Sequence, residues 1–258
     1  MPQLRKDLIT GDWAIIATER AKRPDKFRGG PQSKPVEANN DTCPFCAGNE
    51  GMTPREVYAL DSGKKRKPNS EGWQVRVVPN KFPALIPEVD LHSGKEGLYR
   101  TMTGFGVHEV IIASPRHICD IALLSPPEIM AMLDAYQNRI NELKADDRIQ
   151  SIIIMHNQGR EAGASLDHIH SQLFGLPFIP PVLGKELEGT INYFNRNKKC
   201  AMCDMLKFES REAKRVVYQN RHFMVLQPFA SGSPYQTWIV PRTHCSNFEY
   251  IDGPQKKS

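Results

Sequence analysis

The sequence predicts an α+β fold in which antiparallel sheets carry packed helices, built as a tandem duplication whose second copy is incomplete. Three observations support this prediction: strand segments of alternating polarity, one helix with strong start signals, and a set of motifs that occurs twice in the same order. The 258 residues suffice for one large domain or two smaller ones. We place the first module over residues 1–180 and a partial second module over residues 181–258.

The composition is that of a water-soluble globular protein. Hydrophobic residues make up 40% and charged residues 24% of the chain, which argues against wholesale disorder. The aliphatic run 152–155 is far too short for a membrane span, and the charges in residues 5–7 argue against a secretory signal, so a cytoplasmic protein is expected. The net charge of +5 suits an anionic ligand, and neither a nucleic acid nor a membrane is expected as partner.

Short strands are expected in the first module. Residues 10–18 combine a Gly-Asp turn signal with aromatic and β-branched residues, which is typical of a turn leading into a strand. In residues 73–78 apolar side chains alternate with Gln74 and Arg76, and residues 107–113 form a second strand-like segment. The alternation favours an antiparallel sheet with one polar face.

The most clearly marked helix follows Ser125. This serine is a capping residue, prolines occupy the first turn, and Glu128 stands at the capping-box position. Apolar residues then recur with helical spacing, and the helix is expected to end near residues 146–148. Residues 152–155 have the composition of a buried strand, and a helix of looser periodicity covers residues 183–194.

One set of motifs occurs twice along the chain. Each copy has a Cys-x-x-Cys pair, a strand followed by a Phe-containing turn, and another strand that leads into Pro-Arg and a histidine. The pairs are Cys43/Cys46 and Cys200/Cys203, and the histidines are His117 and His244. In the first copy a helix, a strand, a glycine-rich loop and a His-x-His strand follow, whereas the second copy has no such continuation, so an ancient duplication is expected.

A group of polar residues marks the candidate catalytic segment. His168, His170 and Gln172 alternate along a predicted strand, so their side chains share one face. The preceding loop brings Gly163 and Ser165, which offer flexible backbone and donors of the kind that cradle phosphate oxygens. The alternative is a strand whose polar face meets solvent, but the loop and the two histidines together favour a phosphate-handling site.

Cysteine and histidine spacing indicates metal binding. Six cysteines in a chain without a signal peptide are more typical of metal ligands or free thiols than of disulfides. Cys43 and Cys46 have the spacing of a zinc knuckle or of a redox pair, and the helix-breaking residues that follow them argue against the redox alternative. His117 and His168 are candidates for two further ligands of a tetrahedral site. The second copy offers an incomplete set of ligands, Cys200, Cys203 and His244.

Four ordered motifs extend over most of the chain. They are residues 5–13 with Arg-Lys-Asp and Thr-Gly-x-Trp, the Cys-Pro-Phe-Cys knuckle at 43–46, residues 75–85, and residues 157–172. Together they resemble the bacterial type of the galactose-1-phosphate uridylyltransferase family, within the histidine-triad superfamily. The resemblance implies a histidine-triad fold and, in galactose metabolism, a double-displacement exchange of UMP between UDP-glucose and galactose 1-phosphate.

The resemblance also implies roles for individual residues. His170 corresponds to the nucleophile that holds the nucleotide as a phosphoramidate, and Ser165 and Gln172 to residues that stabilise the phosphates. The implied nucleotide contacts are Arg20, Arg23, Asn80, Phe82, Asn157 and Gly163. The implied ligands of a structural zinc ion are Cys43, Cys46, His117 and His168. Zinc is thus the expected cofactor, with one complete site and a second site that lacks its fourth ligand.

Two departures from the family pattern bear on activity. Ile169 stands where the family usually has proline, a change that we expect activity to tolerate. His168 follows His117 by 51 residues, so the matching element of the second copy is expected near position 295, beyond Ser258. The chain therefore resembles a family member truncated at its carboxyl end, and a homodimer is an expectation taken from the family.

Two alternatives to uridylyl transfer stay open. ADP-sugar phosphorylases and adenylyltransferases of the same superfamily also carry His-x-His-Ser-Gln segments, and these residues do not reveal the base of the donor. A zinc-binding remnant without catalysis is the other alternative, because the second copy is incomplete.

Overall fold

The structure, a computed structural model, describes residues 2–17, 41–63 and 65–258. The predicted nucleotide contacts Arg20 and Arg23 lie outside these residues. All pairings between the named strands are antiparallel, in agreement with the predicted α+β class. In the part of the chain that the structure describes, no helix has the length and apolar character that crossing a membrane requires.

Contacts divide the chain into two compact units. Of the residues that the structure describes, 41–63 and 65–179 form the central unit, and 2–17 together with 180–258 form the split unit. By these contacts the amino-terminal hairpin belongs to the unit that contains residues 181–258. The division into modules over residues 1–180 and 181–258 stays a prediction.

The amino-terminal hairpin packs with the split unit through specific contacts. Its strands are β1 (Gln3–Lys6) and β2 (Trp13–Ile16). Lys185 Nζ lies 2.5 Å from the carboxylate of Asp12. At Gly189 a Cβ atom would lie 1.9 Å from the carbonyl oxygen of Ile9, so only glycine allows the chain segments to approach this closely. These contacts lie far apart in sequence, which is why local patterns do not predict the grouping.

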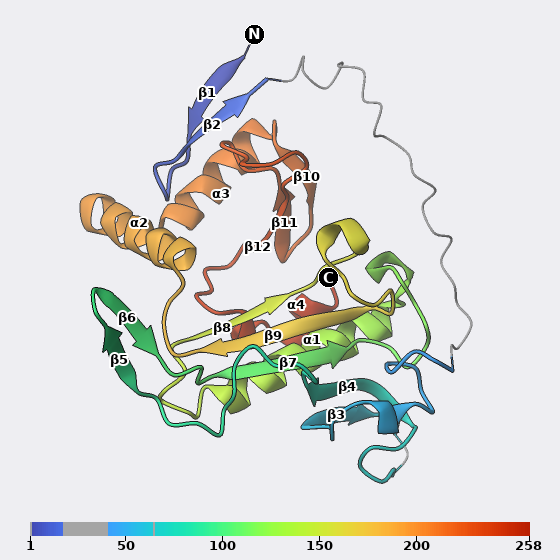
Figure 1. The fold of residues 1–258 in the computed structure, drawn as a ribbon. Coiled ribbons are helices and arrows are strands. Elements are labelled where there is room, and N and C mark those ends of the chain that lie inside the picture. Colours follow the sequence, from blue (N-terminus) through green and yellow to red (C-terminus); the bar gives the residue numbers. More distant parts are fainter. Residues whose placement is uncertain (1, 18–40, 64) are drawn as a thin grey trace. The chain divides into compact units, whose positions relative to one another are not determined.

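The central unit is built on a five-stranded sheet in the order β3-β4-β7-β9-β8 (Figure 1). Its strands are β3 (Tyr58–Asp61), β4 (Trp73–Pro79), β7 (Val107–Ile112), β8 (Ser151–Met155) and β9 (His170–Leu176). A separate hairpin is formed by β5 (Ser93–Glu96) and β6 (Tyr99–Met102). The predicted strands over 73–78 and 107–113 are confirmed as β4 and β7. β8 is half-buried rather than buried, because it lies at the sheet edge with one neighbouring strand.

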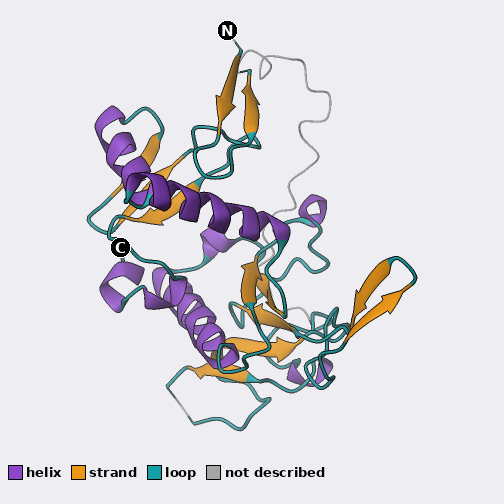
Figure 2. Cartoon of the chain, turned by 90° about the vertical axis from the view of Figure 1, so that its left-hand side faces the viewer, coloured by secondary structure: helices purple, strands orange, loops and turns teal. Residues whose placement is uncertain are grey.

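The strand register gives the sheet two different faces. On one face Val75, Ile111 and Leu173 pack against helix α1 (Pro126–Leu143), which confirms the helix predicted after Ser125. Figure 2 shows α1, in purple, along one side of this sheet. On the other face Val110 pairs with both Val78 and Gln172, and Ile112 pairs with His170. The second face is therefore the one that carries the predicted catalytic segment.

The split unit repeats part of the central topology. It contains α2 (Pro181–Asn197), α3 (Ala201–Glu212), β10 (Val216–Gln219), β11 (Phe223–Leu226), β12 (Trp238–Pro241) and α4 (Gly253–Lys256). The sheet order β10-β11-β12 corresponds to β3-β4-β7. Leu206 of α3 packs on Met224, Leu226 and Val240 of this sheet. Short 3-10 turns in the two units lie at Glu50–Met52, Ile121–Leu123, Arg160–Ala162 and Phe248–Tyr250.

The carboxylate of Glu128 is the centre of the hydrogen bonds at the start of α1. Ser125 donates to Glu128 from its backbone nitrogen at 2.8 Å and from its hydroxyl at 2.7 Å, and Arg116 Nη2 lies 2.9 Å from both carboxylate oxygens. Burial alone would raise the pKa of Glu128, but the hydrogen bonds from Ser125, Arg116 and Ser114 lower it to about 2. The carboxylate therefore stabilises the fold above the pKa of the unfolded chain.

We expect Glu128→Gln to lower the free energy of unfolding by about 1 to 2 kcal/mol at pH 7, because the neutral amide loses the charged contacts of the carboxylate. The effect is not larger because half of the Arg116 side chain is exposed and solvent screens the ion pair. The pKa of the folded state is depressed, so the difference from wild type should persist above the ordinary value of 4.5 and shrink as the pH falls from there toward 2. Urea denaturation at several pH values measures this difference. A difference independent of pH across this window would contradict the role of the charge.

Candidate functional site

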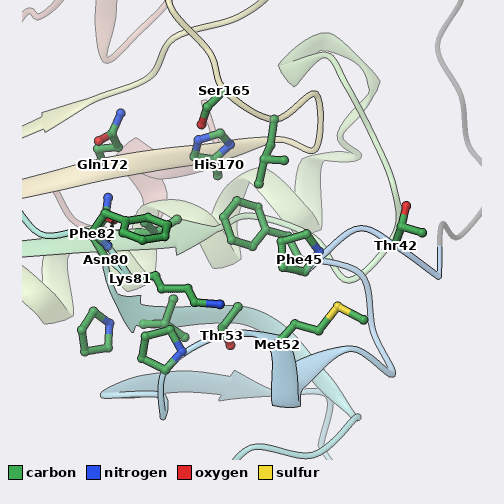
Figure 3. Close-up of a pocket in the computed structure, with 16 residues that line it drawn as sticks. Thr42, Phe45, Met52, Thr53, Asn80, Lys81, Phe82, Ser165, His170 and Gln172 are labelled. Carbon is green, nitrogen blue, oxygen red and sulfur yellow. Dashed lines mark hydrogen bonds between the residues drawn. The ribbon is translucent and has the colours of Figure 1, made fainter.

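His170 lies in a cavity on the face of the sheet opposite α1. The cavity has a volume of about 660 Å³, and Figure 3 shows His170 and Gln172 on the same strand with Ser165 beside them. His170 Nδ1 lies 2.7 Å from the carbonyl oxygen of His168, so this nitrogen carries the proton and donates it. The lone pair of the neutral ring is therefore on Nε2, the nitrogen available to a ligand in the cavity.

The surroundings of His170 favour its neutral form. Burial lowers the pKa of His170, the positive potential of His156 acts in the same direction, and the hydrogen bond to the His168 carbonyl opposes both. The ring of Phe45 lies 5.1 Å from the imidazole, centroid to centroid, and forms an apolar wall. A neutral imidazole held in one orientation is the form that acts as a nucleophile.

The structure gathers several of the predicted site residues around His170. Ser165, Gln172, Asn80 and Phe82 all line the same cavity, although they come from separate segments of the chain. Cavity-lining residues that sequence reasoning did not single out include Thr42, Met52, Thr53 and Lys81. Lys81 stands between the predicted nucleotide contacts Asn80 and Phe82, so its positive charge is a signal that the sequence offers.

The glycine-rich loop contributes mainly through Ser165. Asn157 and Gly163 belong to this loop but are not among the residues that line the cavity. Gly163 has a φ of +86°, and Gly159 a φ of +81°, backbone conformations that favour glycine. The two glycines thus shape the turn that delivers Ser165 to the site, and the predicted ligand contact of Asn157 and Gly163 stays a prediction.

Four buried side chains form a candidate metal centre, and one of them, His168, lies two residues before His170 in the sequence. The ligand atoms of Cys43, Cys46, His117 and His168 all lie within 4.8 Å of one another. Cys46 Sγ lies 3.3 Å from His117 Nδ1 and 3.6 Å from His168 Nδ1. His168 Nε2 donates to the carbonyl of Ser114 at 2.8 Å, which leaves Nδ1 as the nitrogen that faces the thiols.

The chemistry of this donor set fits a zinc ion. Burial lowers the pKa of His168 to about 4, so its imidazole is neutral, as a metal ligand must be. Burial also raises the pKa of the Cys43 thiol, and a bound cation would reverse this effect by stabilising the thiolate. Two cysteines and two histidines around one point are typical of closed, tetrahedral structural zinc sites.

A second group of ligands lies in the split unit. The ligand atoms of Cys200, Cys203 and His244 lie within 4.8 Å of one another, with Cys203 Sγ 3.3 Å from His244 Nδ1. The histidine is exposed and the cysteines are half-buried. Among the described residues this group supplies three ligands, in agreement with the incomplete set that the sequence predicts, and we expect it to hold a metal more weakly than the buried group.

Comparisons with known proteins agree with this geometry. Residues 1–180 match the family model described as "Galactose-1-phosphate uridyl transferase, N-terminal domain". The chain belongs to this family. The chain is similar to the galactose-1-phosphate uridylyltransferase of Thermotoga maritima, which is 28% identical over 258 residues. This match covers 100% of the chain and 72% of the relative.

The chain is also similar to an ADP-glucose phosphorylase of Arabidopsis thaliana. The two sequences are 37% identical over 253 residues, which cover 97% of this chain and 69% of the relative. A crystal structure of an ADP-glucose phosphorylase from the same plant with bound ADP-glucose superposes with a TM-score of 0.79 at 35% identity, over 100% of this chain and 73% of that one. Family membership therefore associates the chain with nucleotidyl transfer involving nucleotide sugars, and both donor types occur among its relatives.

Proposed function

We propose that this chain transfers a nucleotidyl group from a nucleotide sugar to a second phosphate through a covalent intermediate on His170. The observation that carries the proposal is the bond between His170 Nδ1 and the His168 carbonyl, which fixes the tautomer and leaves the lone pair of Nε2 for the cavity. The catalytic residues of this proposal are His170, Ser165 and Gln172.

The first half-reaction is a displacement at phosphorus. Nε2 of His170 attacks the α-phosphorus, an N–P bond forms, and the bond to the bridging oxygen breaks with loss of hexose 1-phosphate. The ring then carries a substituent on Nε2 and a proton on Nδ1, and the carbonyl of His168 stabilises its positive charge. The side chains of Ser165 and Gln172 and the ammonium group of Lys81 supply donors for the phosphate oxygens.

The second half-reaction reverses these events with a different phosphate. An oxygen of the acceptor attacks the phosphorus, the N–P bond breaks, and the electron pair returns to Nε2. The acceptor is galactose 1-phosphate in a uridylyl transfer and inorganic phosphate in a phosphorolysis. Either acceptor is an anion, and the basic side chain in the cavity suits both.

Zinc at the buried centre would act on this reaction through structure alone. When bound by Cys43, Cys46, His117 and His168 it would supply a rigid cross-link, because these four ligands leave no open coordination position. His168 uses its side chain in this centre and its carbonyl oxygen to hold His170. The metal centre and the nucleophile are thus connected through one residue.

The identity of the nucleotide donor, UDP-glucose or ADP-glucose, is a separate part of the proposal. The family model favours UDP-glucose with galactose 1-phosphate as acceptor, which is the function that the sequence motifs imply. The higher identity to the ADP-glucose phosphorylase, 37% against 28%, favours ADP-glucose with phosphate as acceptor. We therefore hold cleavage of ADP-glucose as the second candidate, with the same nucleophile.

Intact-protein mass spectrometry separates these candidates. Zinc-loaded protein is incubated with ADP-glucose or UDP-glucose, and we expect a mass increase of one adenylyl or one uridylyl group, formed faster with the true donor. AMP and UMP have no phosphoanhydride bond to cleave and should leave the mass unchanged. Folded, zinc-loaded protein that gains no mass with either sugar nucleotide would contradict the proposal and would favour a zinc-binding protein without catalysis.

A further inference from the structure

His108 is a buried histidine that neither the sequence motifs nor the proposed reaction uses. It lies on β7 with 8% of its surface exposed, and its ring stacks on Phe174 of the neighbouring strand β9 at a centroid distance of 4.2 Å. The register pairs His108 with Phe174, so its side chain lies on the same face of the sheet as Gln172 and His170. It is therefore placed beside the predicted phosphate contacts.

Hydrogen bonds determine which nitrogen of His108 carries the proton. The backbone N–H of Ala84 donates to Nδ1 at 3.1 Å, so Nδ1 is an acceptor and the proton of the neutral ring is on Nε2. Two side-chain amides approach this N–H group: Gln172 Oε1 at 2.9 Å and Asn80 Nδ2 at 3.1 Å. Because Asn80 Nδ2 is itself a donor, Gln172 Oε1 is the group that accepts the proton of His108.

This bond selects one of the two orientations of the Gln172 amide. With Oε1 turned to His108, the NH₂ group of Gln172 is the end left for the cavity, where it can donate to a phosphate oxygen. The opposite orientation would present a carbonyl oxygen to an anionic phosphate, which is repulsive. Asn80 is fixed in turn by the N–H of Phe82, which donates to its Oδ1 at 2.9 Å.

We propose that His108 is a positioning residue that holds the Gln172 amide with its donors toward the transferred phosphate. The inference rests on the proposed nucleotidyl transfer at His170. It adds a residue that does not line the cavity but affects the rate of this transfer. His108 acts through Gln172 and touches neither the reacting nitrogen nor the phosphate.

Matched substitutions at position 108 test this role. In His108→Phe the ring and its stacking remain but both hydrogen bonds are lost. In His108→Asn an acceptor for Ala84 remains, but the shorter side chain does not reach Gln172. In His108→Gln the longer amide places a donor near the position of the original Nε2. We expect the maximal rate of adduct formation to fall about 10- to 100-fold in the first two variants and to stay within about threefold of wild type in His108→Gln.

The dependence on donor concentration and a double-mutant cycle separate positioning from a general structural role. The concentration of donor at half-maximal rate should change less than about threefold, since the bond affects charge stabilisation more than binding. Adding His108→Phe to Gln172→Ala should cause no further loss, because the residue acts through Gln172. A loss that multiplies in the double variant, or an equal loss in His108→Gln and His108→Asn, would overturn the inference.

Failure of the inference is distinguishable from failure of the proposed function. If the wild-type protein forms no adduct, both the proposed function and the role of His108 are contradicted. Wild-type protein that forms the adduct while His108→Phe and His108→Asn form it at the same rate removes the role of His108 alone. If His108→Phe does not fold, the pair His108→Asn and His108→Gln decides the question, with the thermal midpoint of each variant as the check on folding.

Discussion

Replacing His170 by asparagine is expected to abolish the covalent adduct and to lower the rate of nucleotidyl transfer by about 10⁴-fold or more. Asparagine has no nucleophilic nitrogen, because the lone pair of its amide is delocalised. Its NH₂ group can still donate to the His168 carbonyl, which His170 Nδ1 approaches to 2.7 Å, so the segment should keep its conformation. The change therefore removes the nucleophile with little effect on the fold.

The measurement combines intact mass, rate of product formation and equilibrium binding of the donor. His92→Asn is a matched control, because His92 is an exposed histidine outside the cavity lining, and it should behave as wild type in all three. In His170→Asn we expect the dissociation constant of the donor to change less than about fivefold, since ground-state contacts elsewhere in the cavity remain. An adduct of normal stoichiometry in His170→Asn would show that another residue is the nucleophile.

The parts of the fold that the sequence predicts well are those with local signals. Helix α1 has a capping serine, prolines in its first turn and a glutamate that closes the capping box, and all of these act within four residues. The strands β4 and β7 show apolar residues on the face that meets α1. In these segments local preference and tertiary packing favour the same structure, so the pattern is decisive.

Two features that the sequence does not predict are helix α3 and the first residue of strand β9. Helix α3 begins at Ala201, directly after the first cysteine of the second pair, whereas a Cys-x-x-Cys pair interpreted as a zinc knuckle predicts no helix at this point. The strand containing His170 begins two residues later than expected, because the N–H of Ile169 donates to the carbonyl of Ile118 at 2.6 Å. That contact joins segments that no local pattern relates.

In the candidate site too, some residues have a signal in the sequence and others are found only from contacts between distant strands. The clustering of the predicted ligands is found in the structure although Cys46 and His117 are separated by 71 residues and Cys43 and His168 by 125. Cysteine and histidine at metal-ligand spacing are a strong chemical signal, and their binding of a metal stays a prediction. His108 was not predicted, since its importance arises from the pairing of β7 with β9. A lone histidine in an apolar strand carries no such signal until the register is known.

The second large effect is expected at the buried metal centre. Cys46 Sγ is the central ligand atom, within 3.6 Å of both histidine nitrogens, and Cys46 is 1% exposed. We expect Cys46→Ser to lose about one equivalent of zinc and to lower the free energy of unfolding of the central unit by more than about 3 kcal/mol, since metal binding contributes directly to folding. Cys203→Ser is the matched variant at the half-buried group, and it should lose metal with a smaller effect on stability.

Metal analysis and chemical denaturation of both variants measure these effects. Chelation of the wild-type protein gives an independent test that needs no substitution.

The exposed residue His244 makes the three-ligand group accessible to a chelator, so its metal should leave first and with little loss of adduct formation. Metal at the buried group should leave slowly, and its removal should stop adduct formation because the His168 carbonyl then no longer holds His170 in place. Full adduct formation after both sites have been emptied would show that the nucleophile is positioned without the metal.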